Sequence, residues 1–395
     1  MDNFRGSCLV IKNDGIGDLV LASGVIAYLA KCYGGKLDLV TCEQNREIAE
    51  SIPGVREVLT VSRHGLGFYK YPKMLGLEWE RVPKYDSAVL KFLRHRKYDT
   101  AICLRRYIRA SSLMLMDAVN ADKKYSCWEM VTNASNDFAV NKSIGWQRYQ
   151  DSSASLSELS YYQRFIQHAL GLAATAAPLL SLERGVDVGR TEEDSISLIV
   201  GGDSTNWSTA AWIELVQILT NRGYRLSVFG GPSEEAIARR ILEVAPNCEN
   251  FVGKLTLLEA EKQMAGSSLI IANDTGLTHL ASLRAQRVLI IMGGGTFPRF
   301  FPWPGAVNQY LLLKPLDCYG CNWNCEFESR RCLDHISPKV VAEYGVEILK
   351  GKGEVSRWRL LTPVAHAFNA MKAFPSLPAQ IVEFDEFTNQ TQHEL

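Results

Sequence analysis

Two aspartates flank a pair of glycines near the start of the chain, in the sequence Asn-Asp-Gly-Ile-Gly-Asp at residues 13–18. A short apolar run at residues 8–11 precedes them, and a longer run with helical spacing follows at residues 19–32. A carboxylate at such a junction between a strand and a helix can act as a general base, or it can cap the helix. The residues alone leave Asp14 and Asp18 as rival bases, with helix capping by Asp18 as the structural alternative.

A second group of polar residues lies in the sequence SLIIANDTGLTHLAS at 268–282. The apolar run predicts a strand that ends at Asp274, and a helix follows the turn formed by Thr275 and Gly276. His279 falls in the first turn of that helix. The free amides of a helix start can bind an anion, and a threonine hydroxyl can add a donor. The alternative is that Asp274 or Thr275 only caps the helix and that His279 serves packing.

Two more turns that suit phosphate binding follow predicted strands in the same half of the chain. Their candidate binding residues are Gly201, Gly202 and Ser204 in one turn and Glu234, after Gly230 and Gly231, in the other. Glycine permits close approach of backbone amides to a ligand. Three such turns in one half favour anion binding over capping alone.

Four cysteines lie close together in the sequence DCYGCNWNCEFESRRCL at 317–333, with the spacing C-x2-C-x3-C-x6-C. They are Cys318, Cys321, Cys325 and Cys332. Four thiolates at this spacing can surround Zn or Fe, and an iron–sulfur cluster is the weaker alternative. Such a site leaves no open position for a substrate, so we expect a structural metal and no catalytic one. Free thiols, or disulfides formed after purification, are the remaining interpretation.

Short apolar runs alternate with helical stretches through most of the chain. The expected strands are 7–11, 37–41, 57–61, 99–104, 195–202, 224–231, 268–274 and 287–294. This alternation predicts an α/β protein with two Rossmann-like parallel-sheet domains that face each other across a cleft. We expect an N-terminal domain at 1–182, a charged linker at 183–194, a C-terminal domain at 195–345 that carries the cysteine loop, and a helix with a flexible tail at 346–395. Ligands in such sheets bind beyond the carboxyl ends of the strands, where the polar turns lie.

The composition narrows the class of protein. The chain has 395 residues, with 43 basic and 43 acidic side chains, so no excess positive charge favours nucleic acid as a partner. The N-terminus lacks the pattern of a secretory signal, and no run of about 18 apolar residues predicts a membrane span. We therefore expect a cytoplasmic protein, with peripheral contact to the inner membrane left open.

The stretch VGKLTLLEAEKQMAGSSLIIANDTGLTHLA resembles the nucleotide-sugar-binding segment of the glycosyltransferase family that contains the lipopolysaccharide heptosyltransferases, family 9. The resemblance extends to IKNDGIGDLVLASGVIAYL, YDTAICLR, GGDSTNWSTAAWIELVQIL, GYRLSVFGGPSEE and GGGTFPRFFPWPG, and so covers most of residues 7–340. It implies a GT-B fold whose C-terminal domain holds the donor. It also implies inverting transfer of a heptose from ADP-heptose to a hydroxyl of a glycan, a lipid-linked sugar or a protein.

The resemblance assigns roles to residues that the motifs share. Asp18 matches the catalytic base, and Glu234 matches an acid near the nucleoside ribose. The phosphate turn corresponds to Gly201, Gly202 and Ser204, and the motif that contacts the diphosphate and sugar corresponds to Asp274, Thr275, Gly276 and His279. Autotransporter heptosyltransferases of the same family carry an iron-binding cysteine finger, which supports a metal at the four cysteines.

One position departs from the family pattern. The family often has a lysine just before the tryptophan of the phosphate turn, whereas this chain has Thr205-Asn206-Trp207. The charge of a phosphate must then be balanced by amides, hydroxyls or an arginine from elsewhere.

Several basic residues could face an acceptor, although a solvated surface is the alternative for each of them. They are Lys12, Arg63, His64, Arg105, Arg106 and Arg109, of which Arg105 is best placed because it follows a predicted strand. Four other functions compete with transfer of a heptose from ADP-heptose. A nicotinamide oxidoreductase would need a third glycine after Gly15 and Gly17, and this glycine is absent. A non-catalytic nucleotide-sugar-binding protein, a transferase for a different nucleotide-sugar, and a redox or metal sensor stay open.

Overall fold

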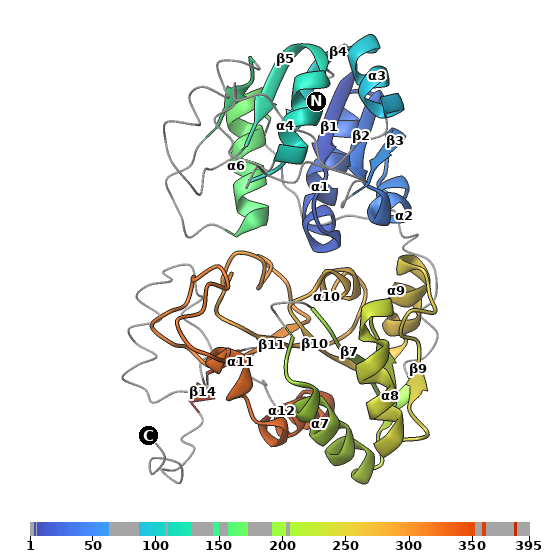
Figure 1. The fold of residues 1–395 in the computed structure, drawn as a ribbon, viewed down its shortest axis with the longest axis vertical. Coiled ribbons are helices and arrows are strands. Elements are labelled where there is room, and N and C mark those ends of the chain that lie inside the picture. Colours follow the sequence, from blue (N-terminus) through green and yellow to red (C-terminus); the bar gives the residue numbers. More distant parts are fainter. Residues whose placement is uncertain are drawn as a thin grey trace. The chain divides into compact units, whose positions relative to one another are not determined.

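The computed structural model describes residues 4, 6–62, 87–106, 110–127, 145–149, 157–172, 192–202, 206–351, 358–360 and 383–384. The chain forms two compact units, and Figure 1 shows their elements. The first unit comprises residues 1–154 and 158–185, and the second comprises residues 155–157 and 186–395.

The N-terminal unit contains a six-stranded sheet in the order β3-β2-β1-β4-β5-β6, and all of its strand pairs are parallel. The strands are β1 (Cys8–Lys12), β2 (Leu37–Cys42), β3 (Val55–Val61), β4 (Lys97–Cys103), β5 (Asn120–Ser126) and β6 (Gln147–Arg148). The helices are α1 (Ile16–Cys32), the 3-10 turn η1 (Glu43–Asn45), α2 (Arg46–Glu50), α3 (Ser87–His95), α4 (Ala110–Ala118) and α6 (Glu158–Leu170).

Helices cover both faces of this sheet, which explains why its central strand is apolar throughout. All five residues of β1 are buried. Leu9 and Ile11 face one core, which also contains Leu93 of α3 and Leu115 of α4. Because neighbouring strand residues point to opposite faces, Val10 faces the side that α1 occupies. Parallel sheets buried on both faces have such continuous apolar strands.

The C-terminal unit contains an eight-stranded parallel sheet in the order β14-β13-β12-β11-β10-β7-β8-β9. The strands are β7 (Glu192–Ile199), β8 (Arg225–Phe229), β9 (Glu249–Asn250), β10 (Ser267–Asn273), β11 (Val288–Met292), β12 (Gln309–Leu313), β13 (Trp358–Leu360) and β14 (Glu383–Phe384). The helices are α7 (Thr209–Asn221), η3 (Pro232–Glu234), α8 (Glu235–Val244), α9 (Leu257–Ala265), α10 (Gly276–Ala281), α11 (Arg331–Asp334) and α12 (Pro338–Lys350). Side chains of α7, α8 and α12 share one core with the sheet.

Each sheet has a point at which the strand order reverses. In the N-terminal unit it lies between β1 and β4, and in the C-terminal unit it lies between β7 and β10. Connections leave such a pair of strands in opposite directions, so a crevice opens at their carboxyl ends, and ligands bind there in open α/β sheets. Ligand-binding residues are therefore expected after β1 and β4 in the first unit and after β7 and β10 in the second.

The predicted α/β class with two parallel sheets is confirmed, and all eight expected strands are present within a few residues. Helix α1 begins at Ile16 and not at residue 19, so Asp18 lies inside the helix. Strand β7 begins at Glu192, inside the stretch 183–194 that we expected to be a linker. Six strands were not expected from the sequence: β5, β6, β9, β12, β13 and β14. Most are very short, and β5 is largely polar because much of it is exposed.

No helix in the described part of the chain is both long enough and apolar enough to cross a membrane.

Candidate functional site

The first helix places Asp18 at the switch point of the N-terminal sheet. Asp18 occupies the third position of α1, and its Oδ2 accepts a hydrogen bond of 3.3 Å from the backbone N–H of Gly15. Its side chain is 24 % exposed, and Oδ1 lies 4.0 Å from Nζ of Lys12. Asp18 thus stabilises the helix start through Oδ2 while its side chain stays partly exposed, so capping and base chemistry are compatible in this residue.

Asp14 has a different environment. Its Oδ2 accepts a 2.8 Å hydrogen bond from Lys12 Nζ and lies 3.9 Å from Nε of Arg105. Its side chain is only 12 % exposed, and Oδ1 is buried without a hydrogen-bond partner among the described residues. Burial raises the pKa of the Asp14 carboxyl, although the charge of Lys12 opposes the change. Asp14 is therefore committed to an ion pair, whereas Asp18 is the more accessible carboxylate.

The basic residues near these acids are buried, so the interpretation of a solvated surface is wrong for three of them. Lys12 is fully buried, and Arg105 and Arg106 are 7 % and 3 % exposed. Arg105 donates to the backbone oxygen of Asn13 at 3.0 Å and to Oγ of Ser112 at 3.0 Å. Arg106 lies 3.5 Å from a carboxylate oxygen of Glu158, on α6. Arg63, His64 and Arg109 lie outside the described residues.

In the C-terminal unit, the glycine turns after β7 and β8 meet over one acidic side chain. A Cβ atom added to Gly201 would come within 2.6 Å of Cγ of Glu234, and one added to Gly230 would come within 3.0 Å of its Cβ. Gly201 and Gly202 also have φ angles of 120° and 101°, in the range that favours glycine. Glu234 accepts a hydrogen bond of 2.8 Å from the Ser233 hydroxyl. The lack of side chains at these glycines therefore allows the two turns to approach Glu234 closely. Ser204, the third candidate of the first turn, lies outside the described residues.

The turn after β10 shows the capping that the sequence left open. Thr275 is the N-cap of α10, and its Oγ1 accepts a 3.4 Å hydrogen bond from the backbone N–H of Thr278. The Thr278 hydroxyl donates to the backbone oxygen of Asn273 at 2.6 Å. Asp274 is 8 % exposed, and the Thr296 hydroxyl donates to its Oδ2 at 3.5 Å. The turn is held by its own hydroxyls, and the carboxylate of Asp274 is oriented from the neighbouring loop.

His279 lies behind this turn and is 3 % exposed. Its ring stacks on Phe301, with centroids 4.1 Å apart and an interplanar angle of 10°. Trp303 donates its indole N–H to Nδ1 of His279 at 3.2 Å, so Nδ1 carries no proton in this arrangement. Nε2 then carries the proton and lies 3.6 Å from Oδ1 of Asp274. His279 thus supports Asp274 from within an aromatic layer.

Asn273, which the sequence analysis did not single out, connects the switch-point turns together with Trp207. Asn273 is fully buried at the end of β10, and its side-chain oxygen accepts a hydrogen bond of 3.1 Å from the backbone N–H of Trp207. The Trp207 ring is also fully buried and donates to the backbone oxygen of Ile336 at 3.2 Å. Next to it, Oδ1 of Asn206 is buried without a hydrogen-bond partner among the described residues. Only the pairing of β7 with β10 brings these residues together, so no local pattern could reveal the connection.

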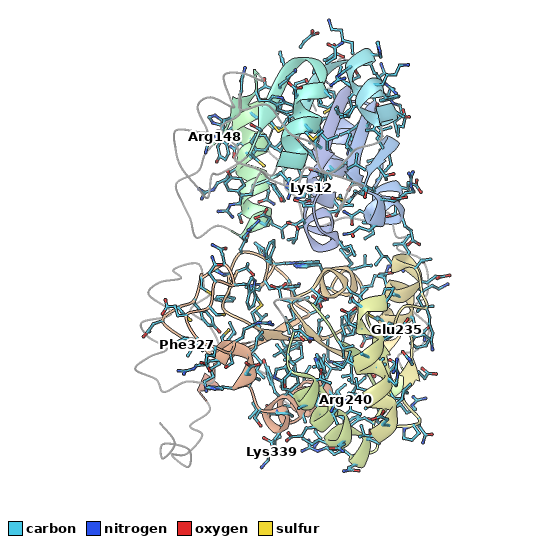
Figure 2. The ribbon with its side chains drawn as sticks, in the orientation of Figure 1. Lys12, Arg148, Glu235, Arg240, Phe327 and Lys339 are labelled. Carbon is cyan, nitrogen blue, oxygen red and sulfur yellow. The ribbon has the colours of Figure 1, made fainter. Side chains whose placement is uncertain are left out.

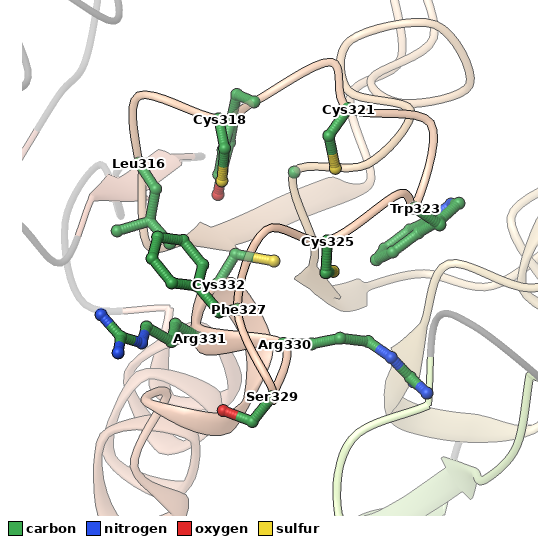
Figure 3. A pocket seen from close by; sticks show the side chains of 12 residues that line it. Leu316, Cys318, Cys321, Trp323, Cys325, Phe327, Ser329, Arg330, Arg331 and Cys332 are labelled. Carbon is green, nitrogen blue, oxygen red and sulfur yellow. The ribbon is translucent and has the colours of Figure 1, made fainter.

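The four cysteines line one small cavity, of about 10 Å³, together with Phe327, Arg330 and Arg331 (Figure 3). Burial raises the pKa of the Cys318 and Cys332 thiols, and the neighbouring cysteines contribute to the same effect. No three His, Cys, Asp or Glu side chains in the described part of the chain are grouped closely enough to hold a metal ion as placed. The residues have the right number and type for a metal, but their sulfur atoms are not assembled around a common centre.

The cysteine loop docks on the three glycines that follow β11. Backbone N–H groups of Gly320 and Asn322 donate to the oxygens of Gly294 and Gly295, both at 2.8 Å. A Cβ atom on Gly294 would lie 2.1 Å from the ring of Tyr319, and one on Gly295 would lie 2.3 Å from that of Trp323. The missing side chains thus make room for two aromatic rings of the loop. The cysteine loop is therefore packed against the loop that carries Thr296, the partner of Asp274.

Comparison with known sequences identifies the second unit. Residues 199–324 match the sequence profile of Glycosyltransferase family 9 (heptosyltransferase). The lipopolysaccharide heptosyltransferase 2 of Salmonella typhimurium is 29 % identical over 314 residues, which cover 74 % of this chain and 84 % of the relative. The lipooligosaccharide heptosyltransferase 2 of Haemophilus influenzae is 30 % identical over 106 residues, or 26 % of this chain. This second match spans only 30 % of the length of that relative.

Solved structures share the fold over nearly the whole chain. The family 9 glycosyl transferase of Veillonella parvula superposes with a TM-score of 0.67 at 15 % identity, covering 89 % of this chain and 99 % of the other. The E. coli heptosyltransferase WaaC, solved with ADP-2-deoxy-2-fluoro heptose, gives a TM-score of 0.62 at 19 % identity and covers 86 % and 99 %. The two units thus have the fold of GT-B heptosyltransferases. Residues 199–324 thus match glycosyltransferase family 9, and the chain is similar to a heptosyltransferase over 74 % of its length.

Proposed function

We propose that this protein is an inverting glycosyltransferase that moves a heptose from ADP-heptose onto a hydroxyl group, with Asp18 as the general base. The observation that carries the proposal is the position of Asp18 at the switch point of the N-terminal sheet. There the side chain of Asp18 is 24 % exposed, and its Oδ1 makes no hydrogen bond with the described residues. A base must come within hydrogen-bond reach of the proton that it removes, and the greater exposure of Asp18, 24 % against 12 % for Asp14, supports Asp18 in this role.

The geometry of the C-terminal switch point supports the donor half of the proposal. Glycine turns, the oriented carboxylate of Asp274 and the acid Glu234 lie at the carboxyl ends of β7, β8 and β10, where nucleotides bind in such sheets. Asn206 adds a buried oxygen that has no partner among the residues that the structure describes, as expected for a group that accepts a hydrogen bond from a ligand. The structure of WaaC with an ADP-heptose analogue supports ADP as the nucleotide.

In the proposed reaction, Asp18 takes the proton of the acceptor hydroxyl as its oxygen attacks the anomeric carbon. The bond from that carbon to the diphosphate breaks, and ADP leaves with the electron pair. Backbone amides of the glycine turns are suited to stabilise the leaving diphosphate because they are fixed before the reaction. A glycan, a lipid-linked sugar or a protein side chain can supply the hydroxyl.

A thermal-shift panel of ADP-heptose, UDP-sugars and GDP-sugars tests the donor. We expect ADP-heptose to raise the unfolding midpoint, because a ligand at 100 times its Kd stabilises the native state by about 2.7 kcal/mol. Glu234→Gln should weaken this shift. Glu235→Gln is the matched control, since this neighbouring glutamate is exposed and begins α8. A larger shift with a UDP- or GDP-sugar would contradict the donor assignment, and donor binding without ADP release would favour a non-catalytic binding protein.

We also propose that the cysteine loop holds a structural Zn or Fe ion, bound by Cys318, Cys321, Cys325 and Cys332. All four line one cavity. Burial raises the pKa of Cys318 and Cys332 because it disfavours the thiolate, and a bound cation would stabilise that charged form. The ion would cross-link a loop that contains little regular secondary structure. It would take no part in the transfer, because four thiolates leave no open position.

Elemental analysis of protein purified under reducing, oxygen-free conditions tests the metal proposal. We expect about one Zn or Fe per chain, since four thiolates complete a tetrahedral site. Cys325→Ser should lower the content strongly. Cys248→Ser is the control, because Cys248 is a buried thiol outside the cysteine loop. A wild-type protein with only traces of metal would refute the site.

A further inference from the structure

We infer that Lys12 is a positioning residue for Asp18: its buried ammonium, fixed by Asp14 and by Tyr162 of α6, supplies the positive charge that keeps Asp18 available as a base. The inference rests on the proposed role of Asp18. Lys12 is the last residue of β1, and Figure 2 shows it inside the N-terminal unit. Its side chain has no exposed surface, so it cannot bind an acceptor directly.

The Lys12 ammonium makes two hydrogen bonds to other groups and lies near Asp18 without a hydrogen bond to it. Nζ donates to Oδ2 of Asp14 at 2.8 Å and to the hydroxyl of Tyr162 at 2.6 Å. Oδ1 of Asp18 lies 4.0 Å away, too far for a hydrogen bond but close enough for strong attraction in a partly buried site. A Lys ammonium has three donors, so two hold it in place while its charge acts on the third neighbour.

Helix α6 supplies a support that is remote in sequence. The Tyr162 hydroxyl, which accepts from Lys12, donates in turn to Oε1 of Glu158 at 2.7 Å. Glu158 is 1 % exposed, and its other oxygen lies 3.5 Å from Nη1 of Arg106. Nζ of Lys12 also lies over the ring of Tyr162, 4.8 Å from its centroid. This chain of contacts fixes the ammonium from helix α6, independently of Asp14.

The positive and negative charges around Lys12 are equal in number, so the loss of Lys12 should leave an excess of carboxylates. The groups around Lys12 are the acids Asp14, Asp18 and Glu158, the hydroxyl of Tyr162 and the thiols Cys103 and Cys127, while Arg105 and Arg106 lie against Asp14 and Glu158. Three cations therefore meet three carboxylates. Without Lys12, the carboxylates of Asp14 and Asp18 would face each other with a reduced positive charge. Two such acids resist simultaneous ionisation, so the pair would hold a proton to higher pH.

The test uses three variants and the pH profile of ADP release from ADP-heptose, supplied with a total extract of bacterial envelope glycans as acceptors. Lys12→Met should move the acid limb of the profile to higher pH by about 1–3 units, the usual effect of a charge at this distance. Asp14→Asn should move it to lower pH, because Lys12 then acts on Asp18 alone. The double variant Lys12→Met, Asp14→Asn should return the limb toward the wild-type position. It removes both members of the buried ion pair, which avoids leaving one of the two charges buried without the other.

A titration of the carboxyl carbons in protein with ¹³C-labelled aspartate gives a readout that does not depend on activity. The signals of the Asp14–Asp18 pair, assigned from Asp14→Asn and Asp18→Asn, should titrate at higher pH in Lys12→Met. If they do not move, or if Lys12→Met lowers turnover equally at every pH, the inference is overturned. If they move as expected while Asp18→Asn keeps full turnover, the base assignment fails and the electrostatic role of Lys12 stands. The two failures are thus distinguishable.

Discussion

Asp18→Asn is expected to lower the rate of sugar transfer by about 10²- to 10⁴-fold, the usual contribution of a general base. An asparagine cannot take up the proton of the acceptor hydroxyl, so attack on the anomeric carbon would be slowed at every pH. Donor binding should change little, because the expected donor residues belong to the other compact unit. The rate of ADP release and the Kd of ADP-heptose, measured on the same preparation, check this result.

The substitution should leave the helix start intact. The side-chain oxygen of Asn can still accept the hydrogen bond that Gly15 donates to Oδ2 of Asp18. Glu259→Gln provides a matched control, since Glu259 occupies the equivalent third position of α9 and accepts from the backbone N–H of Thr256 at 2.9 Å. It should affect neither turnover nor folding. A parallel loss of donor affinity and turnover in Asp18→Asn, or no loss of either, would show that Asp18 is not the base.

Gly294→Ala is expected to destabilise the C-terminal unit by about 1–3 kcal/mol, the range found when a packed site receives an extra group. The added methyl group would lie 2.1 Å from the ring of Tyr319, whose hydroxyl is also buried. The ring cannot stay where it is, so the cysteine loop must shift from its position on Gly294 and Gly295. The midpoint of thermal unfolding should fall by roughly 2–4 °C for each kcal/mol in a unit of this size.

A control and a double-mutant cycle separate this contact from a general effect of alanine. Gly266→Ala adds the same methyl group at the end of α9, where the nearest atom is 3.5 Å away, and it should be neutral or slightly stabilising. In a Tyr319→Ala background, Gly294→Ala should cost little, because the ring with which it collides is gone. Equal destabilisation by Gly294→Ala in both backgrounds would rule out the clash as the cause.

Those residues of the candidate site that lie at the end of a recognisable strand or in a glycine turn were predictable from the sequence. Asp18 and Asp274 each follow an apolar strand, and glycines mark the turns at Gly201 and Gly230, so strand ends and polar turns could be read together. The support behind these residues was not predictable in this way. Glu158 and Tyr162 lie on a helix about 150 residues after Lys12, and nothing in the spacing of α6 indicates that its acid pairs with Arg106. The role of Trp303 in fixing His279 depends on a similar long-range contact.

The sequence by itself determined the α/β class, the repeated strand–helix units and the polar turns, because side-chain period and turn residues are local properties. Only the tertiary structure decided which of two neighbouring aspartates is accessible. Asp14 and Asp18 have the same chemistry, and the difference arises because the buried ammonium of Lys12 pairs with the first and only approaches the second. Tertiary packing likewise placed the basic residues Lys12, Arg105 and Arg106 inside the fold. Burial and charge partners depend on residues distant in sequence, and they appear only when the sheet and its helices have assembled.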